Sequence, residues 1–119
     1  MKIENDRLES VLDALKDLAA NRLPGAAAFE VMKVKRAVAT AYGTVIEARD
    51  ALIVAHAPEG RIDPAHEAWT AFLPEHDALM GEESEVDCQP LEPKGWLSAV
   101  EIKPDSLGIL DFVGLLKAL

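Results

Sequence analysis

Three histidines are the side chains of this chain that could transfer protons near neutral pH without a shifted pKa. They are His56, His66 and His76. Glu67 and Asp77 directly follow two of them, but adjacent side chains on a helix point in different directions. No two of the histidines have the three- or four-residue spacing of a helical metal site. We therefore expect surface or helix-capping histidines, with no catalytic role, no bound metal and no cofactor.

The single cysteine, Cys88, is a poor candidate for a nucleophile. It lies among carboxylates, which are expected to raise the pKa of its thiol, and no histidine is close to it in sequence. Its place in the alternating run from Glu85 to Gln89 predicts a buried strand position. Gly108 and Gly114 are isolated, so no glycine-rich phosphate loop is present. These observations predict that the protein is not an enzyme.

Two helices account for the first half of the chain. Leucine and valine recur every three or four residues from Leu8 to Leu18, which predicts an amphipathic helix. Asn5 or Asp6 could cap this helix, and a start near Lys2 is an alternative. The helix is expected to end at the turn over 23–25, Leu-Pro-Gly.

A second, long helix is predicted over 26–56, a segment without proline. An apolar stripe follows it with a step of three or four residues: Ala27, Val31, Val34, Val38, Ala41, Val45, Ala48, Leu52 and Ala55. Gly43 lies within the helix and is expected to permit close approach of a neighbour. The stripe predicts hairpin packing or self-association through Val31, Val34, Val38, Val45 and Leu52.

The first helix is too short to cover the whole stripe. We therefore expect the C-terminal helix or another subunit to cover the rest, and a homo-oligomer such as a dimer is expected.

The second half of the chain contains shorter elements. Asp63-Pro64 predicts the start of a third helix that Pro74 bends or divides and Gly81 ends. The runs 85–89 and 98–102 could form a small hairpin or two isolated extensions. A last helix, starting at 104–106, is expected to dock on the hairpin.

These elements predict one mainly α-helical domain over 1–119. It comprises an antiparallel helical hairpin (1–56) with a long second helix, and an acidic half (57–119) with shorter helices and a small β hairpin as one option.

Acidic residues outnumber basic ones, 21 to 12, and the formal net charge of -9 belongs to the second half. This charge argues against direct nucleic-acid binding, and the chain has no apolar run long enough to predict membrane insertion. The candidate partner-binding surface comprises Glu82, Glu83, Glu85, Asp87 and Glu92. It could be a solvated face that keeps the protein soluble, or a docking surface for a basic protein.

The chain opens with Met-Lys-Ile-Glu-Asn, continues through a leucine helix and a long helix, and has an acidic stretch over 82–86. It closes with the pattern Ile-Lys-Pro-Asp-Ser-Leu-Gly-Ile-Leu over 102–110. This order of features resembles a family of small bacteriophage or prophage proteins of unknown function, over most of the chain. The resemblance implies a phage origin and no enzymatic activity, and it carries no catalytic residues.

We therefore expect a non-enzymatic, phage-derived protein that binds another protein as a structural or assembly component. It would lie in the cytoplasm of the bacterial host or in the virion. The first alternative is an acidic inhibitor of a host nucleic-acid-binding or defence protein. The second is a small metal-dependent hydrolase, which would need His66, His76 and nearby carboxylates to converge in one pocket.

Overall fold

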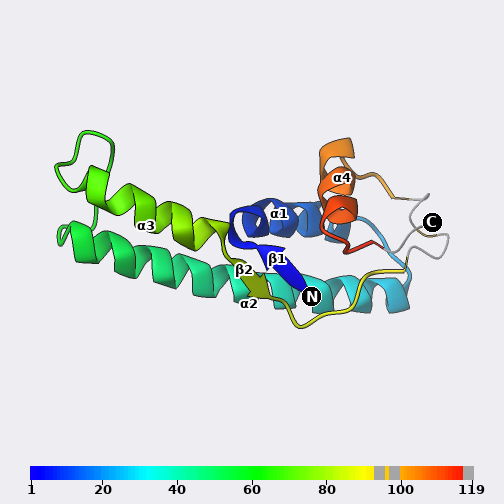
Figure 1. Cartoon of the computed structure of the whole chain (residues 1–119). Coiled ribbons are helices and arrows are strands. Elements are labelled where there is room, and N and C mark those ends of the chain that lie inside the picture. Colours follow the sequence, from blue (N-terminus) through cyan, green and yellow to red (C-terminus); the bar gives the residue numbers. More distant parts are fainter. Residues whose placement is uncertain (93–95, 97–99, 117–119) are drawn as a thin grey trace.

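The computed structural model of the chain describes residues 1–92, 96 and 100–116. Two short strands, one 3₁₀ helix and four α-helices occur in this part. In chain order they are β1 (Lys2–Glu4), η1 (Asn5–Arg7), α1 (Leu8–Ala19), α2 (Gly25–His56), α3 (Trp69–Gly81), β2 (Glu83–Glu85) and α4 (Pro104–Phe112). The molecule is elongated, 53 × 24 × 21 Å, with α2 along its full length (Figure 1). The predicted mainly helical class with a long second helix is confirmed.

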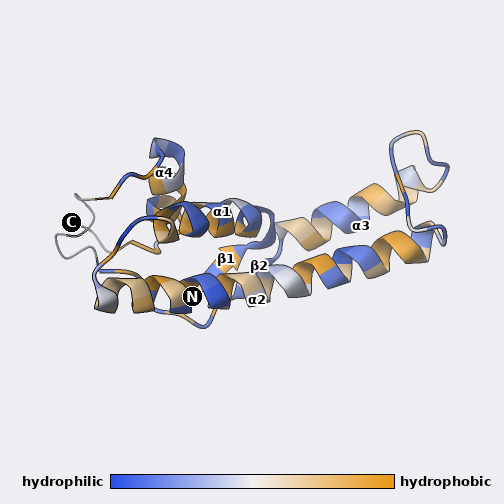
Figure 2. Ribbon diagram, turned by 180° about the vertical axis from the view of Figure 1, so that it is seen from behind, coloured by the Kyte–Doolittle hydropathy of each residue, from blue (hydrophilic) through white to orange (hydrophobic). Residues whose placement is uncertain are grey.

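Helices α1 and α2 form the predicted antiparallel hairpin. Pro24 has φ -53° and ψ 147°, an extended conformation from which α2 begins. The buried leucines of α1, Leu8, Leu12, Leu15 and Leu18, belong to one apolar cluster with the valines of α2. Apolar residues recur along both helices (Figure 2). Burial of these side chains is the main source of the hairpin's stability. Helical propensity alone contributes little, because most helical stability in proteins comes from packing of the apolar face.

After Val45 the less exposed side of α2 departs by one residue from the predicted apolar stripe. Four of the predicted packing residues are buried, namely Val31, Val34, Val38 and Val45, but Leu52 is half-buried. Ala48 and Ala55 are exposed, and the half-buried positions are instead Arg49, Leu52, Ile53 and His56. The expectation of one unbroken stripe was therefore wrong. A helix turns once in 3.6 residues, so a stripe repeating every 3.5 residues drifts around it.

A different helix from the expected one covers this far half of α2. Helix α3 contacts α2, whereas α4 packs on α1. The chain returns along α2 after the loop over 57–68, which places α3 beside the later turns of α2 (Figure 1). The prediction that the last helix docks on the hairpin is thus confirmed, and the prediction that it covers the rest of the stripe is wrong. Gly43 is exposed with open space around its Cα, so it permits no close approach.

Helix α3 begins later than predicted. The Asp63 Oδ1 atom accepts a hydrogen bond from the Ala65 amide (2.8 Å), which closes a turn rather than capping the helix. The helix starts at Trp69, runs through Pro74 as a single element and ends at Gly81. The division into two helices is therefore not observed, and the predicted terminator is confirmed.

The small sheet pairs different segments from those of the expected hairpin. β2 pairs in antiparallel register with β1, as Lys2 with Glu85, Ile3 with Ser84 and Glu4 with Glu83. Of the predicted second strand, 98 and 99 lie outside the described residues, and 100–102 form no strand. Cys88 lies in irregular chain and is half-buried, not in a strand. The two strands join the start of the chain to the segment that follows α3.

Asn5 connects the sheet to α3 instead of capping α1. Its side chain is buried, with its Nδ2 donating to the Leu79 carbonyl oxygen (2.7 Å) and its Oδ1 accepting from the Ser84 hydroxyl. The residue before α1 is Arg7, and no side-chain cap is formed there. The expected capping by Asn5 or Asp6 is therefore wrong. The side-chain amide of Asn5 hydrogen-bonds to Leu79 and Ser84, which are distant in sequence, instead of to the start of α1.

Helix α4 is attached to the end of α1 by polar contacts. Asn21 exchanges two hydrogen bonds with the main chain of Glu101, at 2.8 and 2.9 Å. The Lys103 amide donates to the Asp17 Oδ2 atom at 3.0 Å. Leu110 is fully buried in the cluster that contains the α1 leucines.

Among the described residues, no helix has the length and apolar character needed to cross a bilayer.

Candidate protein-binding surface

The outer face of the two-stranded sheet is acidic. Along β1, Ile3 is buried while Lys2 and Glu4 are exposed, so the exposed side chains share the face turned away from the core. Glu83 and Glu85 are exposed on the same face, opposite Glu4 and Lys2 respectively. Exposed Glu82 and Asp87 flank β2. We call these carboxylates, Glu4, Glu82, Glu83, Glu85 and Asp87, the acidic face.

Four of the five predicted partner-binding residues belong to the acidic face, and the fifth does not. Glu92 lines a separate cavity of about 710 Å³ near the start of α2, with Pro24, Ala27 and Trp96 among its other residues. Sequence reasoning missed Glu4, because α1, α2 and α3 lie between Glu4 and Glu83 in the sequence. The local signal was the polar–apolar alternation of Lys2-Ile3-Glu4, which is too short to predict a strand by itself.

The acidic face is only partly neutralised. The Met1 ammonium group lies 2.9 Å from the Glu85 Oε1 atom, and its hydrogen bond and charge hold the pKa of Glu85 below its usual value. The Arg7 Nε atom lies 3.7 Å from the Glu4 carboxylate. Within the described part of the chain, Glu82, Glu83 and Asp87 make no ion pair. A net negative potential therefore remains over β2 and its flanks.

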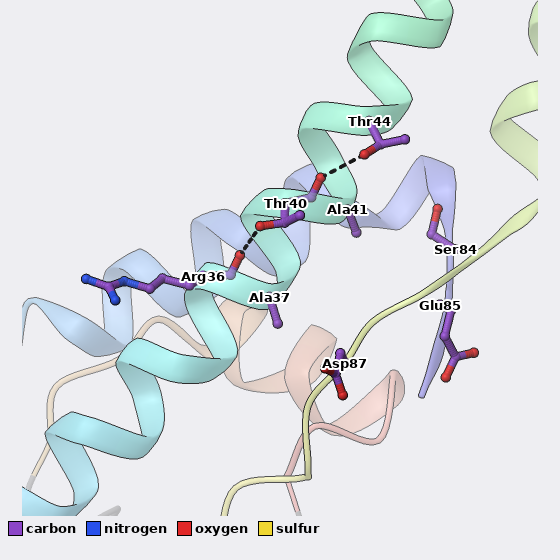
Figure 3. A pocket seen from close by; sticks show the side chains of 8 residues that line it. All are labelled: Arg36, Ala37, Thr40, Ala41, Thr44, Ser84, Glu85 and Asp87. Carbon is purple, nitrogen blue, oxygen red and sulfur yellow. Dashed lines mark hydrogen bonds between the residues drawn. The ribbon is translucent and has the colours of Figure 1, made fainter.

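A groove of about 530 Å³ lies beside this face, between α2 and the segment around β2 (Figure 3). Its lining is Arg36, Ala37, Thr40, Ala41, Thr44, Ser84, Glu85 and Asp87. The Thr40 and Thr44 hydroxyls donate to carbonyl oxygens of their own helix, at 3.0 and 3.2 Å. The Ser84 hydroxyl donates to Asn5. The groove's hydroxyls are thus held by internal hydrogen bonds, and neither a histidine nor the cysteine lines it.

The histidines lie elsewhere, and two of them have partners that the sequence did not suggest. The Nε2 atom of His56 contacts the Glu75 carboxylate, and the Nε2 atom of His66 lies 2.5 Å from the Glu59 Oε1 atom. The sequence offered only neighbouring carboxylates as partners, whereas folding brings Glu75 and Glu59 to these histidines from elsewhere in the chain. Their surface or capping character holds for His66, whose Nδ1 accepts the Ala68 amide just before α3 (3.0 Å).

The hydrolase alternative finds no site in the described residues. His76 has Asp77 as its nearest carboxylate, 3.6 Å away, and its ring packs on Phe72, as does the ring of His56. His66 pairs with Glu59 instead. No group of three or more histidine, cysteine, aspartate or glutamate side chains within the described ranges has a geometry that could hold a metal ion.

Cys88 is half-buried near the acidic face. Burial raises the pKa of its thiol, and the charge of Asp87 raises it further, while the N-terminal ammonium group acts in the opposite direction. The predicted direction is confirmed, but desolvation is a larger cause than the neighbouring carboxylates. A thiol with a raised pKa holds little thiolate near neutral pH and is a weak nucleophile.

The hydrogen bonds around Glu59 predict a local pH dependence. A hydrogen bond from its own backbone and one from His66 lower the pKa of Glu59 from its usual 4.5. A folded-state pKa below the unfolded value adds stability above pH 4.5, and this contribution is lost as the pH falls through the folded-state pKa. We expect the amide chemical shift of Ala68 to titrate with Glu59 in an NMR series below pH 5.

In the Glu59→Gln variant the titration of Ala68 should lose the component that comes from Glu59. The control is Glu67→Gln, which removes the exposed carboxylate directly before Ala68 and should leave the Glu59 component in place. An unchanged titration in the Glu59 variant would show that His66 and Glu59 do not act together.

The chain was also compared with known proteins. No family model, curated protein or solved structure matches it.

Proposed function

We propose that this chain is a non-enzymatic protein-binding protein whose acidic face docks on a basic surface of a partner protein. The observation that carries the proposal is the set of exposed carboxylates without ion pairs in the described structure, Glu82, Glu83 and Asp87, gathered over β2. Complementary charge accelerates association and selects partners of opposite sign. The elongated hairpin behind the face supplies a rigid support, since Val31 and Val38 are buried along it.

The role we propose for this binding is structural or in assembly, in a particle of phage or prophage origin. The protein would then lie in the bacterial cytoplasm or in the virion, without direct contact to nucleic acid or membrane. Self-association is part of the proposal, because Phe29 and Met32 on the outer side of α2 are 58% and 46% exposed. Light scattering of the purified protein tests this part, and a strictly monomeric mass would contradict it.

The docking proposal predicts which surface variant loses its partner. Reversing three charges, in Glu82→Lys, Glu83→Lys and Asp87→Lys together, replaces attraction to a basic surface with repulsion. We expect proteins captured from a bacterial host lysate by the unmodified chain at low salt to be absent with this variant. Capture should also fall as salt is raised, because exposed charges are screened over about 8 Å at physiological ionic strength.

The matched control reverses Glu9, Asp13 and Glu47, three exposed carboxylates of the helices that make no recorded interaction with the described residues. It makes the same change in net charge and should retain the partner. Equal loss in both variants would show that total charge matters and not the acidic face. Capture of a DNA-binding host protein would favour the inhibitor alternative over the assembly role.

A further inference from the structure

We propose that the groove between α2 and β2 binds an extended segment of the partner by strand addition to β2, with lysine or arginine at every second position of that segment. The inference rests on the proposed protein-binding function and names how the partner is held. Strand addition uses main-chain hydrogen bonds for affinity and alternate side chains for specificity.

The hydrogen-bond pattern of the sheet leaves one edge of β2 open toward the groove. The Asn5 amide donates to the Glu82 carbonyl oxygen (2.8 Å), and the Val86 amide donates to the Met1 carbonyl oxygen (2.6 Å). In an antiparallel pair hydrogen-bonded residues alternate with non-hydrogen-bonded ones. Ile3 and Ser84 therefore form the hydrogen-bonded pair, and the main-chain groups of Glu83 and Glu85 point away from β1.

The groove lies on this open side. In Figure 3 helix α2 forms one wall of the groove, and the segment with Ser84, Glu85 and Asp87 forms the other. Among the described residues, neither the amide of Glu85 nor that of Asp87 has a recorded hydrogen-bond partner across the groove. An added strand would supply hydrogen-bond partners for these groups.

The charges along β2 select a basic occupant. Side chains directly opposite each other on adjacent strands interact, and opposite charges there are favourable. β1 already provides an example, since Lys2 lies opposite Glu85. Glu83, by contrast, lies opposite the like-charged Glu4. A lysine or arginine of an added strand, placed beside Glu83 on the outer face, would relieve this repulsion.

The opposite wall selects the intervening residues. Ala37 and Ala41 are half-buried, short side chains on the α2 side of the groove. The side chain of Arg36 points to the left in Figure 3, away from Asp87. Side chains of an added strand that alternate with the basic ones would point inward, toward the alanines. A branched apolar residue such as valine fills this space and favours the extended conformation.

The probe that tests the inference is a capped peptide of four Lys-Val repeats, titrated against the intact protein and followed by NMR. We expect shifts at the amides of Glu83, Glu85 and Asp87 and along 36–44. The same peptide with glutamate for lysine should not bind. Glu83→Lys should weaken binding roughly tenfold, since it exchanges an attractive cross-strand pair for a repulsive one.

Two pairs of matched reagents separate strand addition from simple charge attraction. Thr40→Trp places a large ring in the groove and should abolish binding, whereas Ala39→Trp, on an exposed neighbouring position, should not. N-methylation of the peptide at its lysine amides, or at its valine amides, removes one of the two alternate sets of N–H donors. Strand addition requires that one set be essential and the other dispensable, the lysine set for antiparallel and the valine set for parallel addition.

Binding that survives both methylated sets, or Thr40→Trp, would overturn the inference. Loss of binding with both sets, or no binding of the unmodified peptide, would overturn it as well. The lysate capture described above is independent of this result. Capture that depends on the acidic face, together with a peptide that fails these tests, would leave the proposed function standing and reject strand addition.

Discussion

Replacing Val38 by aspartate is expected to unfold the hairpin. Val38 is 0% exposed in the middle of α2, within the cluster that contains the α1 leucines. A buried carboxylate there would have neither water nor a cation to stabilise its charge. Leaving a charge buried and unpaired costs about 3–5 kcal/mol, and a domain of this size has a free energy of unfolding of about 5–15 kcal/mol. Thermal and denaturant unfolding, followed by circular dichroism, measure the loss.

The control is Ala39→Asp, which makes the same kind of change at the next residue, on the exposed side of α2. It should alter the free energy of unfolding by less than about 1 kcal/mol, since exposed helix positions tolerate a charge. Similar transitions for both variants would show that the stripe of α2 is not buried. Self-association through Val38 would give the same loss but with a melting temperature that rises with protein concentration.

The sequence was sufficient to predict the hairpin, because its signal is repetitive. Leu8, Leu15 and Leu18 repeat with the helical period, and so do Val31, Val34 and Val38. Each buried residue adds to the same pattern, so a few exceptions do not hide it. The pattern failed beyond Val45, where Ala48 and Ala55 are exposed and the half-buried positions include Arg49 and His56, residue types that an apolar pattern does not select.

The acidic face could be predicted only in part, because it depends on a contact between distant segments. Each strand has three residues, too few for alternation to be distinguished from chance. Glu83 and Glu85 were found from the density of acidic residues, a property of the local sequence. Their partners across the sheet, Glu4 and Lys2, and the groove against Thr40 follow from the path of the whole chain, which no local pattern encodes.

The paired histidines illustrate the same limit. His56 ends α2, and Glu75 lies in α3, so their contact exists because α3 runs back along α2. Of the sequence neighbours, Asp77 lies 3.6 Å from His76, while Glu67, in the turn before α3, makes no ion pair with the described residues. The position of α3 was itself predictable only roughly. Asp63-Pro64 is typical of a helix start but forms a turn here, closed by the Asp63 side chain. The sequence does not show at which residue the helical hydrogen bonds begin.

The connection between the sheet and α3 leads to a second large expected effect, at Asn5. Its side chain is 5% exposed and bonds at one end to the Leu79 carbonyl oxygen (2.7 Å) and at the other to the Ser84 hydroxyl. Asn5→Ala leaves both of these groups without that partner. The Leu79 carbonyl oxygen keeps the Glu82 amide as a donor (3.3 Å), so the cost comes mainly from the Ser84 hydroxyl. A polar group left without a partner costs about 1–3 kcal/mol, and the free energy of unfolding should fall by about that amount. Denaturant unfolding measures it.

The matched control is Asp6→Ala, at the exposed neighbouring position, for which a change below about 0.5 kcal/mol is expected. A double-mutant cycle of Asn5→Ala with Ser84→Ala isolates the bond that joins the two strands. We expect a coupling energy of about 1 kcal/mol, because the second substitution removes a hydroxyl already without its partner. Additive effects in this cycle would show that Asn5 stabilises α3 alone. Strong coupling would mean that the acidic face and the end of α3 unfold as one cooperative unit. Asn5 bonds to Leu79 and to Ser84, and Glu82 and Glu83 lie between these two residues.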